Sequence, residues 1–199
     1  MTVEIKFSPM NPFKIINKYY NSDSEEYQTL VLHSTMVAKK ALDIVDRLET
    51  NQSITESISK EFIYEVAMLH DIGFKFPGEL KNKNELSAHY PTHGYYGAEI
   101  LRKEGLLKHA QVIENHVGVG LTKKEIDNNK WPMPSKDYLP QTIEEKIISY
   151  ADLFYSKNCK IPQGFFEERA KNEVIEKIKK YQNGSEKIKV FLEWDKIFT

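Results

Sequence analysis

Two side chains of types that can bind metal ions stand next to each other in the stretch Met68-Leu69-His70-Asp71-Ile72-Gly73. An imidazole and a carboxylate are both ligands for divalent metals. The pair follows an apolar run and precedes a glycine, which indicates the end of a helix. Because neighbouring residues of a regular helix point about 100° apart, both side chains can reach one ion only where the helix is ending. The sequence therefore predicts a metal site at this helix end.

Four further side chains of the same kinds are candidate partners for this pair. We expect His33 and Asp152 to join it around one ion, since packed helices can place ligands in the interior of a bundle. His93 and His116 would hold a second ion about 3.5–4 Å away, with Asp71 bridging the two. One or two divalent ions, among Mn, Fe, Ni, Co, Zn and Mg, would then provide a hydroxide nucleophile for attack on phosphorus.

The elements that must position these ligands are predicted to be helices. Apolar residues recur at helical spacing from Glu25 to about Leu48, and His33 shares that face. The doublet ends an amphipathic helix from Ile58 to His70, with Ser53 as its predicted N-cap. No stretch predicts a strand convincingly, so we expect an all-α fold, a helical bundle with a central metal cleft. Further helices are expected over residues 12–20, 92–104, 107–116, 142–153, 165–182 and 185–195.

Local signals refine these helices around the candidate ligands. Thr92 is expected to cap the helix that begins at His93, and the small residues Gly94 and Gly97 would let that helix pack closely. Thr142 and Glu145 have the spacing of a capping box, which starts the helix carrying Asp152. Residues 127–141 are predicted to form a loop.

An irregular stretch follows the doublet. Residues 74–91 contain Pro77-Gly78 and polar residues without sustained periodicity, and a long loop next to a site is typical of a lid. We expect Lys75 in this lid to orient a substrate phosphate, in a catalytic role beside Asp71. His89 is interpreted as a lid residue, because Pro91 breaks the helix that its spacing to His93 would need.

Bulk properties limit the possible functions. The chain has 199 residues, a net charge of −1 and one cysteine, Cys159. We divide it into an N-terminal arm with a short helix (1–24), a metal-binding core (25–160) and a C-terminal helical extension (161–199). The charge gives no general case for nucleic acid or membrane binding, and a single cysteine fits the cytoplasm. The last two helices could cap the core or form the interface of a homodimer.

Several other residues have simpler interpretations. His109 and the lysines between 171 and 189 are expected to be solvated on the surface, and Cys159 to have no chemical role. Trp131 and Trp194 are expected to anchor packing.

The pattern resembles the HD-domain superfamily of metal-dependent phosphohydrolases, in particular small HDIG-type members from archaea and bacteria. The match consists of His33, His70-Asp71 within His-Asp-Ile-Gly, and Asp152 within Tyr-Ala-Asp, with His93 and His116 matching the added histidines of two-metal members. The resemblance implies an all-helical fold and hydrolysis of a nucleotide or another small phosphate ester. Phe74, where the cyclic-dinucleotide branch carries a lysine, argues against that substrate.

Two alternatives remain open on the same residues. The first is a di-iron oxygenase, since some relatives use a similar ligand set for oxygen chemistry. The second is a non-catalytic sensor or binding module, in which a nucleotide would bind and stabilise the fold without turnover. Oxygen dependence separates the first from a hydrolase, and the absence of turnover separates the second.

Overall fold

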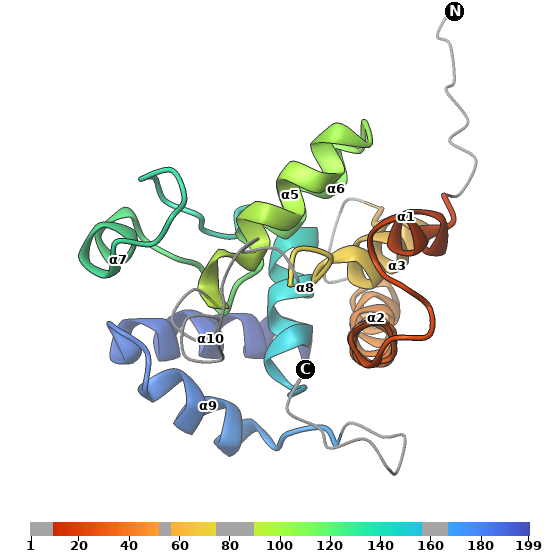
Figure 1. Cartoon of the computed structure of the whole chain (residues 1–199). Helices are drawn as coiled ribbons and strands as arrows, with labels where there is room; N and C mark the ends of the chain where they lie inside the picture. The colour runs from red at the N-terminus through yellow and green to blue at the C-terminus, as the bar shows by residue number, and fades with distance from the viewer. Residues whose placement is uncertain (1–9, 52–56, 75–89, 157–166) are drawn as a thin grey trace, which may run out of the picture.

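The structure is a computed structural model that describes residues 10–51, 57–74, 90–156 and 167–199. Within these ranges the chain is helical, and one isolated antiparallel bridge pairs Leu121 with Tyr138. The predicted all-α fold is confirmed (Figure 1). The helices are α1 (Pro12–Tyr19), α2 (Glu25–Thr50), α3 (Lys60–Leu69), the 3₁₀ helix η1 (Tyr90–Thr92), α5 (His93–Lys103), α6 (Leu107–Asn115), α7 (Lys123–Asn129), α8 (Ile143–Leu153), α9 (Lys171–Lys179) and α10 (Gly184–Phe198).

The core lies where α2, α3 and α8 pack on one another. Figure 1 shows α8 in the middle of the molecule, with α2 and α3 on one side and α10 on the other. Apolar side chains from all three helices are fully buried there, including Ile44, Ile63 and Ile148. Each such burial stabilises the fold by about 1.5–3 kcal/mol. The α5–α6 pair packs on this core through α6, which contacts α3 and α8.

Side-chain caps fix where the ligand-bearing helices begin. The Ser24 hydroxyl accepts a hydrogen bond from the Tyr27 amide at the start of α2. Thr142 and Glu145 form the predicted capping box of α8. The N-cap of α3 is Ser59, whose hydroxyl accepts from the Phe62 amide. The sequence prediction of Ser53 as the N-cap of this helix is therefore wrong, and Ser53 itself lies outside the described residues. The helix begins at Lys60, two residues after the predicted Ile58.

Two other local predictions differ from the structure. Helix α7 was not expected, and its last residues fall inside the predicted loop of 127–141. Its start is fixed by a capping box between Thr122 and Glu125. Thr92 stands at the N-cap of α5 but makes no capping hydrogen bond with its side chain. The reason is that η1 leads directly into α5, so that Thr92 already has helical backbone angles of φ −82° and ψ −7°.

The C-terminal helices contact the core through buried polar groups. The Tyr150 hydroxyl on α8 donates to Asp195 Oδ1 on α10 at 2.8 Å. The Lys187 ammonium lies 2.7 Å from Glu125 Oε1 and donates to the Gly120 carbonyl. Lys187 is buried, so the prediction that all lysines of 171–189 are solvated is wrong for it. Trp194 is buried and Trp131 packs against Leu121, Ile126 and Tyr138, as expected for packing anchors.

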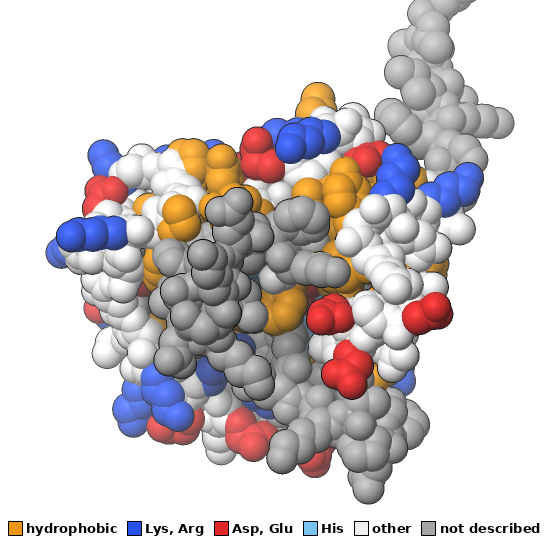
Figure 2. Space-filling model, in the orientation of Figure 1, with side chains coloured by type: hydrophobic (Ala, Val, Ile, Leu, Met, Phe, Trp, Pro, Cys, Tyr) orange, Lys and Arg blue, Asp and Glu red, His pale blue; other side chains and the backbone are white. Residues whose placement is uncertain are grey.

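The surface carries charges of both signs. On the face shown in Figure 2, lysine and arginine side chains are interspersed with aspartate and glutamate. None of the helices in the described ranges is both long enough and apolar enough to cross a membrane.

Candidate metal centre

Three helices bring the first group of predicted ligands together. His33 comes from the middle of α2, His70 and Asp71 from the end of α3, and Asp152 from α8. The Nε2 atom of His33 lies 2.9 Å from Asp152 Oδ1 and 3.2 Å from His70 Nε2. All four side chains are buried, and their donor atoms lie within 4.8 Å of one another.

The second group joins α5 and α6 to the same aspartate. His93 is the first residue of α5, and His116 follows the last residue of α6. Their Nε2 atoms are 3.1 Å apart. Together with Asp71 they form a second buried set of donor atoms within 4.8 Å. The structure therefore places all six predicted ligands in two adjoining groups.

The two oxygens of Asp71 face different groups. Oδ2 lies 3.3 Å from the Nε2 atoms of both His33 and His70. Oδ1 lies 3.1 Å from His93 Nε2 and 3.7 Å from His116 Nε2. A carboxylate in this position can bind one ion through each oxygen, which is the geometry of a bridging ligand.

Backbone carbonyls orient three of the four imidazoles in the same way. The Nδ1–H groups of His70, His93 and His116 each donate to the carbonyl three residues earlier, at 2.6 Å. A carbonyl only accepts, so Nδ1 carries the proton and Nε2 presents its lone pair to the cluster. For His70 and His116 the acceptors belong to the final turns of α3 and α6, where carbonyls have no donor within the helix. This arrangement is the one found around metal-binding histidines.

The charge balance of the cluster also fits a cation. Burial lowers the pKa of His70, but the Asp71 and Asp152 carboxylates outweigh this effect and raise it to about 9. Burial, only partly offset by Asp71, lowers the pKa of His116 to about 4. The two buried carboxylates therefore favour positive charge in the cluster, and a bound divalent ion would supply that charge while the imidazole Nε2 atoms stay unprotonated.

The separations between donor atoms match those of ligands sharing an ion. Two donors each about 2.1 Å from a metal are about 3.0 Å apart at a right angle and about 3.4 Å apart at the tetrahedral angle. The separations of 2.9–3.5 Å within the first group lie within about 0.1 Å of that range. The residues present therefore fit one or two divalent ions.

Glycines let the doublet approach α5. A Cβ atom on Gly73 would lie 2.2 Å from the His93 carbonyl oxygen and 2.3 Å from the Gly97 nitrogen. Only hydrogen atoms fit in that space, so Gly73 allows the backbone after Asp71 to contact the first turns of α5. The predicted close packing through Gly94 and Gly97 is also present, since α5 lies directly against Ile113 of α6 and against Gly73.

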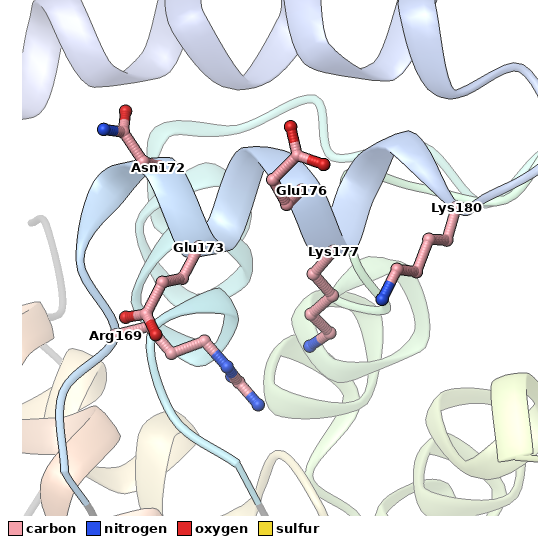
Figure 3. Close-up of a pocket in the computed structure, with 6 residues that line it drawn as sticks. All are labelled: Arg169, Asn172, Glu173, Glu176, Lys177 and Lys180. Carbon is pink, nitrogen blue, oxygen red and sulfur yellow. The ribbon is translucent and has the colours of Figure 1, made fainter.

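A cleft of about 420 Å³ opens at the first group. Its described lining combines His33 and Asp71 with two apolar residues, one hydroxyl residue and two acidic residues: Leu30, Phe74, Thr29, Glu25 and Glu26. Lys75, His89 and Cys159 lie outside the described residues, as does most of the predicted lid, so those predictions stay open. A second hollow, of about 510 Å³, lies along α9 and contains none of the six candidate ligands. Figure 3 shows its polar lining, including Arg169, Lys177 and Lys180.

One histidine lies in an environment that the sequence did not predict. His109 was expected to be solvated, but its side chain is buried and its Nε2 lies 2.9 Å from Glu65 Oε2. It also packs edge-on against Phe62. The prediction was wrong because Glu65 comes from α3 and nothing near His109 in the sequence indicates it. This pair lies outside both ligand groups.

Comparison with known families agrees with the geometry of the cluster. The model of the HD domain matches residues 30–156, which is more than half of the chain. The chain belongs to the HD-domain family. HD domains bind divalent metals, and the buried histidine and aspartate cluster can hold them.

Relatives of this HD-domain chain include proteins of different lengths. It is 36% identical over 138 residues to the uncharacterized protein MJ0778 of Methanocaldococcus jannaschii, covering 63% of this chain and 80% of that protein. It is 31% identical to the tRNA (cytidine(56)-2′-O)-methyltransferase of Picrophilus torridus, covering 75% of this chain but 40% of that protein. A protein of the same name from Thermoplasma volcanium is 34% identical over 100 residues, covering 49% of this chain and 26% of that protein. No solved structure matches.

Proposed function

We propose that this chain is a metal-dependent phosphohydrolase that acts on a small phosphate ester, with a nucleotide as the expected substrate. The observation that carries the proposal is Asp71, whose two oxygens face two separate groups of buried imidazoles. When bound, divalent ions would supply Lewis acidity at the phosphoryl oxygens and lower the pKa of a water molecule.

The six candidate ligands would bind two ions in two sets that share Asp71. His33, His70, Asp152 and Asp71 Oδ2 would hold one ion, and Asp71 Oδ1 with His93 and His116 the other. Backbone carbonyls already orient the rings of His70, His93 and His116 for binding.

The size and lining of the cleft limit which substrates can reach the ligand groups. Its volume of about 420 Å³ falls within the usual range of small-molecule sites, and Leu30 and Phe74 give it an apolar wall for the part of the substrate that carries the phosphate. Lys75 remains our candidate for orienting the phosphate.

The proposal is tested with the purified chain, its metal content and a panel of esters. The chain is first loaded with Mn²⁺, Co²⁺, Ni²⁺ or Zn²⁺. Release of p-nitrophenolate is then measured from p-nitrophenyl phosphate and bis-p-nitrophenyl phosphate, and release of inorganic phosphate from the common nucleotides. We expect H70A and D71A to abolish turnover, while D43N, at an exposed position of α2, retains it. Turnover must also persist without oxygen, since an oxygenase would stop. Hydrolysis that is unchanged in H70A and D71A would refute the proposal, and nucleotide binding without any turnover would favour a sensor.

Two relatives have names that refer to tRNA, so RNA is added to the substrates tested. Both are called tRNA methyltransferases, and this chain spans less than half of each, so we do not propose methyl transfer for it. A matching segment within a tRNA-modifying protein makes RNA phosphate esters a second candidate substrate. Oligonucleotides ending in a 3′-phosphate or a 2′,3′-cyclic phosphate therefore belong in the assay, and release of phosphate or opening of the ring would support this candidate.

A further inference from the structure

A tyrosine outside the HD-domain match contacts the turn that carries Asp71. Tyr20 follows α1 directly, and its hydroxyl donates to the Ile72 carbonyl at 3.0 Å. The family model begins only at residue 30. Tyr20 is 3% exposed and Ile72 is fully buried, so this hydrogen bond is shielded from water. The two residues are 52 positions apart in the chain.

The turn that receives this hydrogen bond has left the helix but remains buried. The Ile72 amide still donates to the Leu69 carbonyl at 3.0 Å, and the Phe74 amide donates to the Asp71 carbonyl at 2.8 Å. Carbonyls beyond a helix end have no partner within the helix, and a buried one needs a donor from elsewhere. Tyr20 supplies a donor to the carbonyl of Ile72, the residue that follows Asp71.

Helix α1 is itself held firmly, so the tyrosine hydroxyl has a fixed position. Ile15 and Ile16 are buried, and α1 packs on α3. The Met10 amide donates to Glu65 Oε1, and the Tyr19 hydroxyl donates to Glu104 Oε1 at 2.8 Å. These contacts join α1 to α3 on one side and to the end of α5 on the other.

We propose that Tyr20 is a positioning residue of the metal centre. Its hydrogen bond fixes the 70–73 turn so that Asp71 Oδ2 faces His33 and His70 while Oδ1 faces His93 and His116. The inference rests on the proposed metal-dependent function. Asp71 is the one residue common to both ligand groups, so a shift of this turn would weaken the binding of both ions.

Two adjacent tyrosines provide a matched pair of variants. Y20F removes the hydroxyl that contacts the turn, and Y19F removes the hydroxyl that contacts Glu104. Both keep the aromatic ring. Binding of Mn²⁺ is measured by calorimetry, Tm is measured in the presence of a chelator, and kcat and KM are measured with the best substrate of the panel. We expect Y20F to weaken Mn²⁺ binding by about tenfold or more and to lower kcat with little change in KM, since residues that orient metal ligands typically contribute 10- to 100-fold in affinity.

The outcomes separate this inference from the proposed function. Y19F should bind Mn²⁺ within about twofold of the unaltered protein, with a Tm in chelator close to that of Y20F. Equal Mn²⁺ affinity and kcat in Y20F and Y19F would overturn the positioning role while leaving the phosphohydrolase intact. An unaltered protein that binds no divalent metal would overturn both. A Y20F protein that fails to fold would also overturn the inference, because the hydroxyl would then serve the fold as a whole.

Discussion

Replacing Gly73 by alanine tests whether close backbone contact sets the geometry of the metal centre. The new Cβ would lie 2.2 Å from the His93 carbonyl oxygen, whereas ordinary contact begins at 3.4 Å, so the two backbones must separate by about 1.2 Å. A shift of that size would carry His93 Nε2, now 3.1 Å from Asp71 Oδ1, out of reach of a shared ion. Misplacement by about 1 Å can lower turnover by about 100-fold.

The same substitution also has a cost in stability. Forcing an extra methyl group into a packed contact costs about 1–3 kcal/mol. For a domain of this size, Tm changes by about 2–4 °C per kcal/mol, so G73A should lower Tm by about 2–12 °C. We therefore expect a folded but less stable protein with about 100-fold lower kcat and weaker binding at the His93–His116 group.

The control must destabilise the protein without moving the site. Gly105, between α5 and α6, has φ +76°, and a Cβ atom there would meet nothing within 4 Å. G105A therefore introduces only backbone strain of about 1–2 kcal/mol. Metal affinity and kcat of both variants are compared at a temperature where both are folded by circular dichroism. If G73A and G105A have the same kcat and metal affinity, the contact between Gly73 and α5 does not set the geometry and our reasoning fails.

Three further predictions follow from particular contacts. Asp71→Asn should reduce bound metal, measured by mass spectrometry, more than Asp152→Asn, because Asp71 faces both groups and Asp152 only one; equal losses would argue against a bridging role. Lys187→Met should lower Tm by about 6–12 °C, because it removes the cation that faces the buried Glu125 carboxylate, at a cost of about 3 kcal/mol. K189M, in an exposed pair, should change Tm by less than about 2 °C. Removing the acidic cleft residues in a combined E25Q/E26Q variant should lower KM for nucleoside triphosphates more than for p-nitrophenyl phosphate, because two negative charges next to the cleft repel the more highly charged ester; an equal change in both would contradict this.

The candidate site could be anticipated because its signals are local. A histidine and an aspartate next to each other require a helix end, and Gly73 provides one. Asp152 lies on an apolar helix face, where an unpaired carboxylate would be costly. These are statements about a few neighbouring residues, and the structure does place the six side chains in two groups. Binding of metal by those groups remains a prediction.

The features that were missed depend on partners far away in the chain. His109 and Lys187 have the composition of surface residues, and each is buried only because a glutamate on another helix faces it. Tyr20 gives no local sign that it contacts the turn after Asp71. Helix α7 did carry a signal, the capping-box spacing of Thr122 and Glu125, but the Asp-Asn-Asn that follows favours a loop by propensity.

Three imidazoles donate to the backbone carbonyl three residues earlier, so the aim of these rings depends little on the residues that line the cleft. At His70, His93 and His116 the hydrogen-bond acceptor that orients each ring is a main-chain atom of the same short segment. Residues on the walls of the opening, such as Thr29 or Leu30, can therefore be exchanged without re-aiming the rings. Substitutions at those lining residues could therefore change which molecules enter the cleft while the three imidazoles keep their orientation.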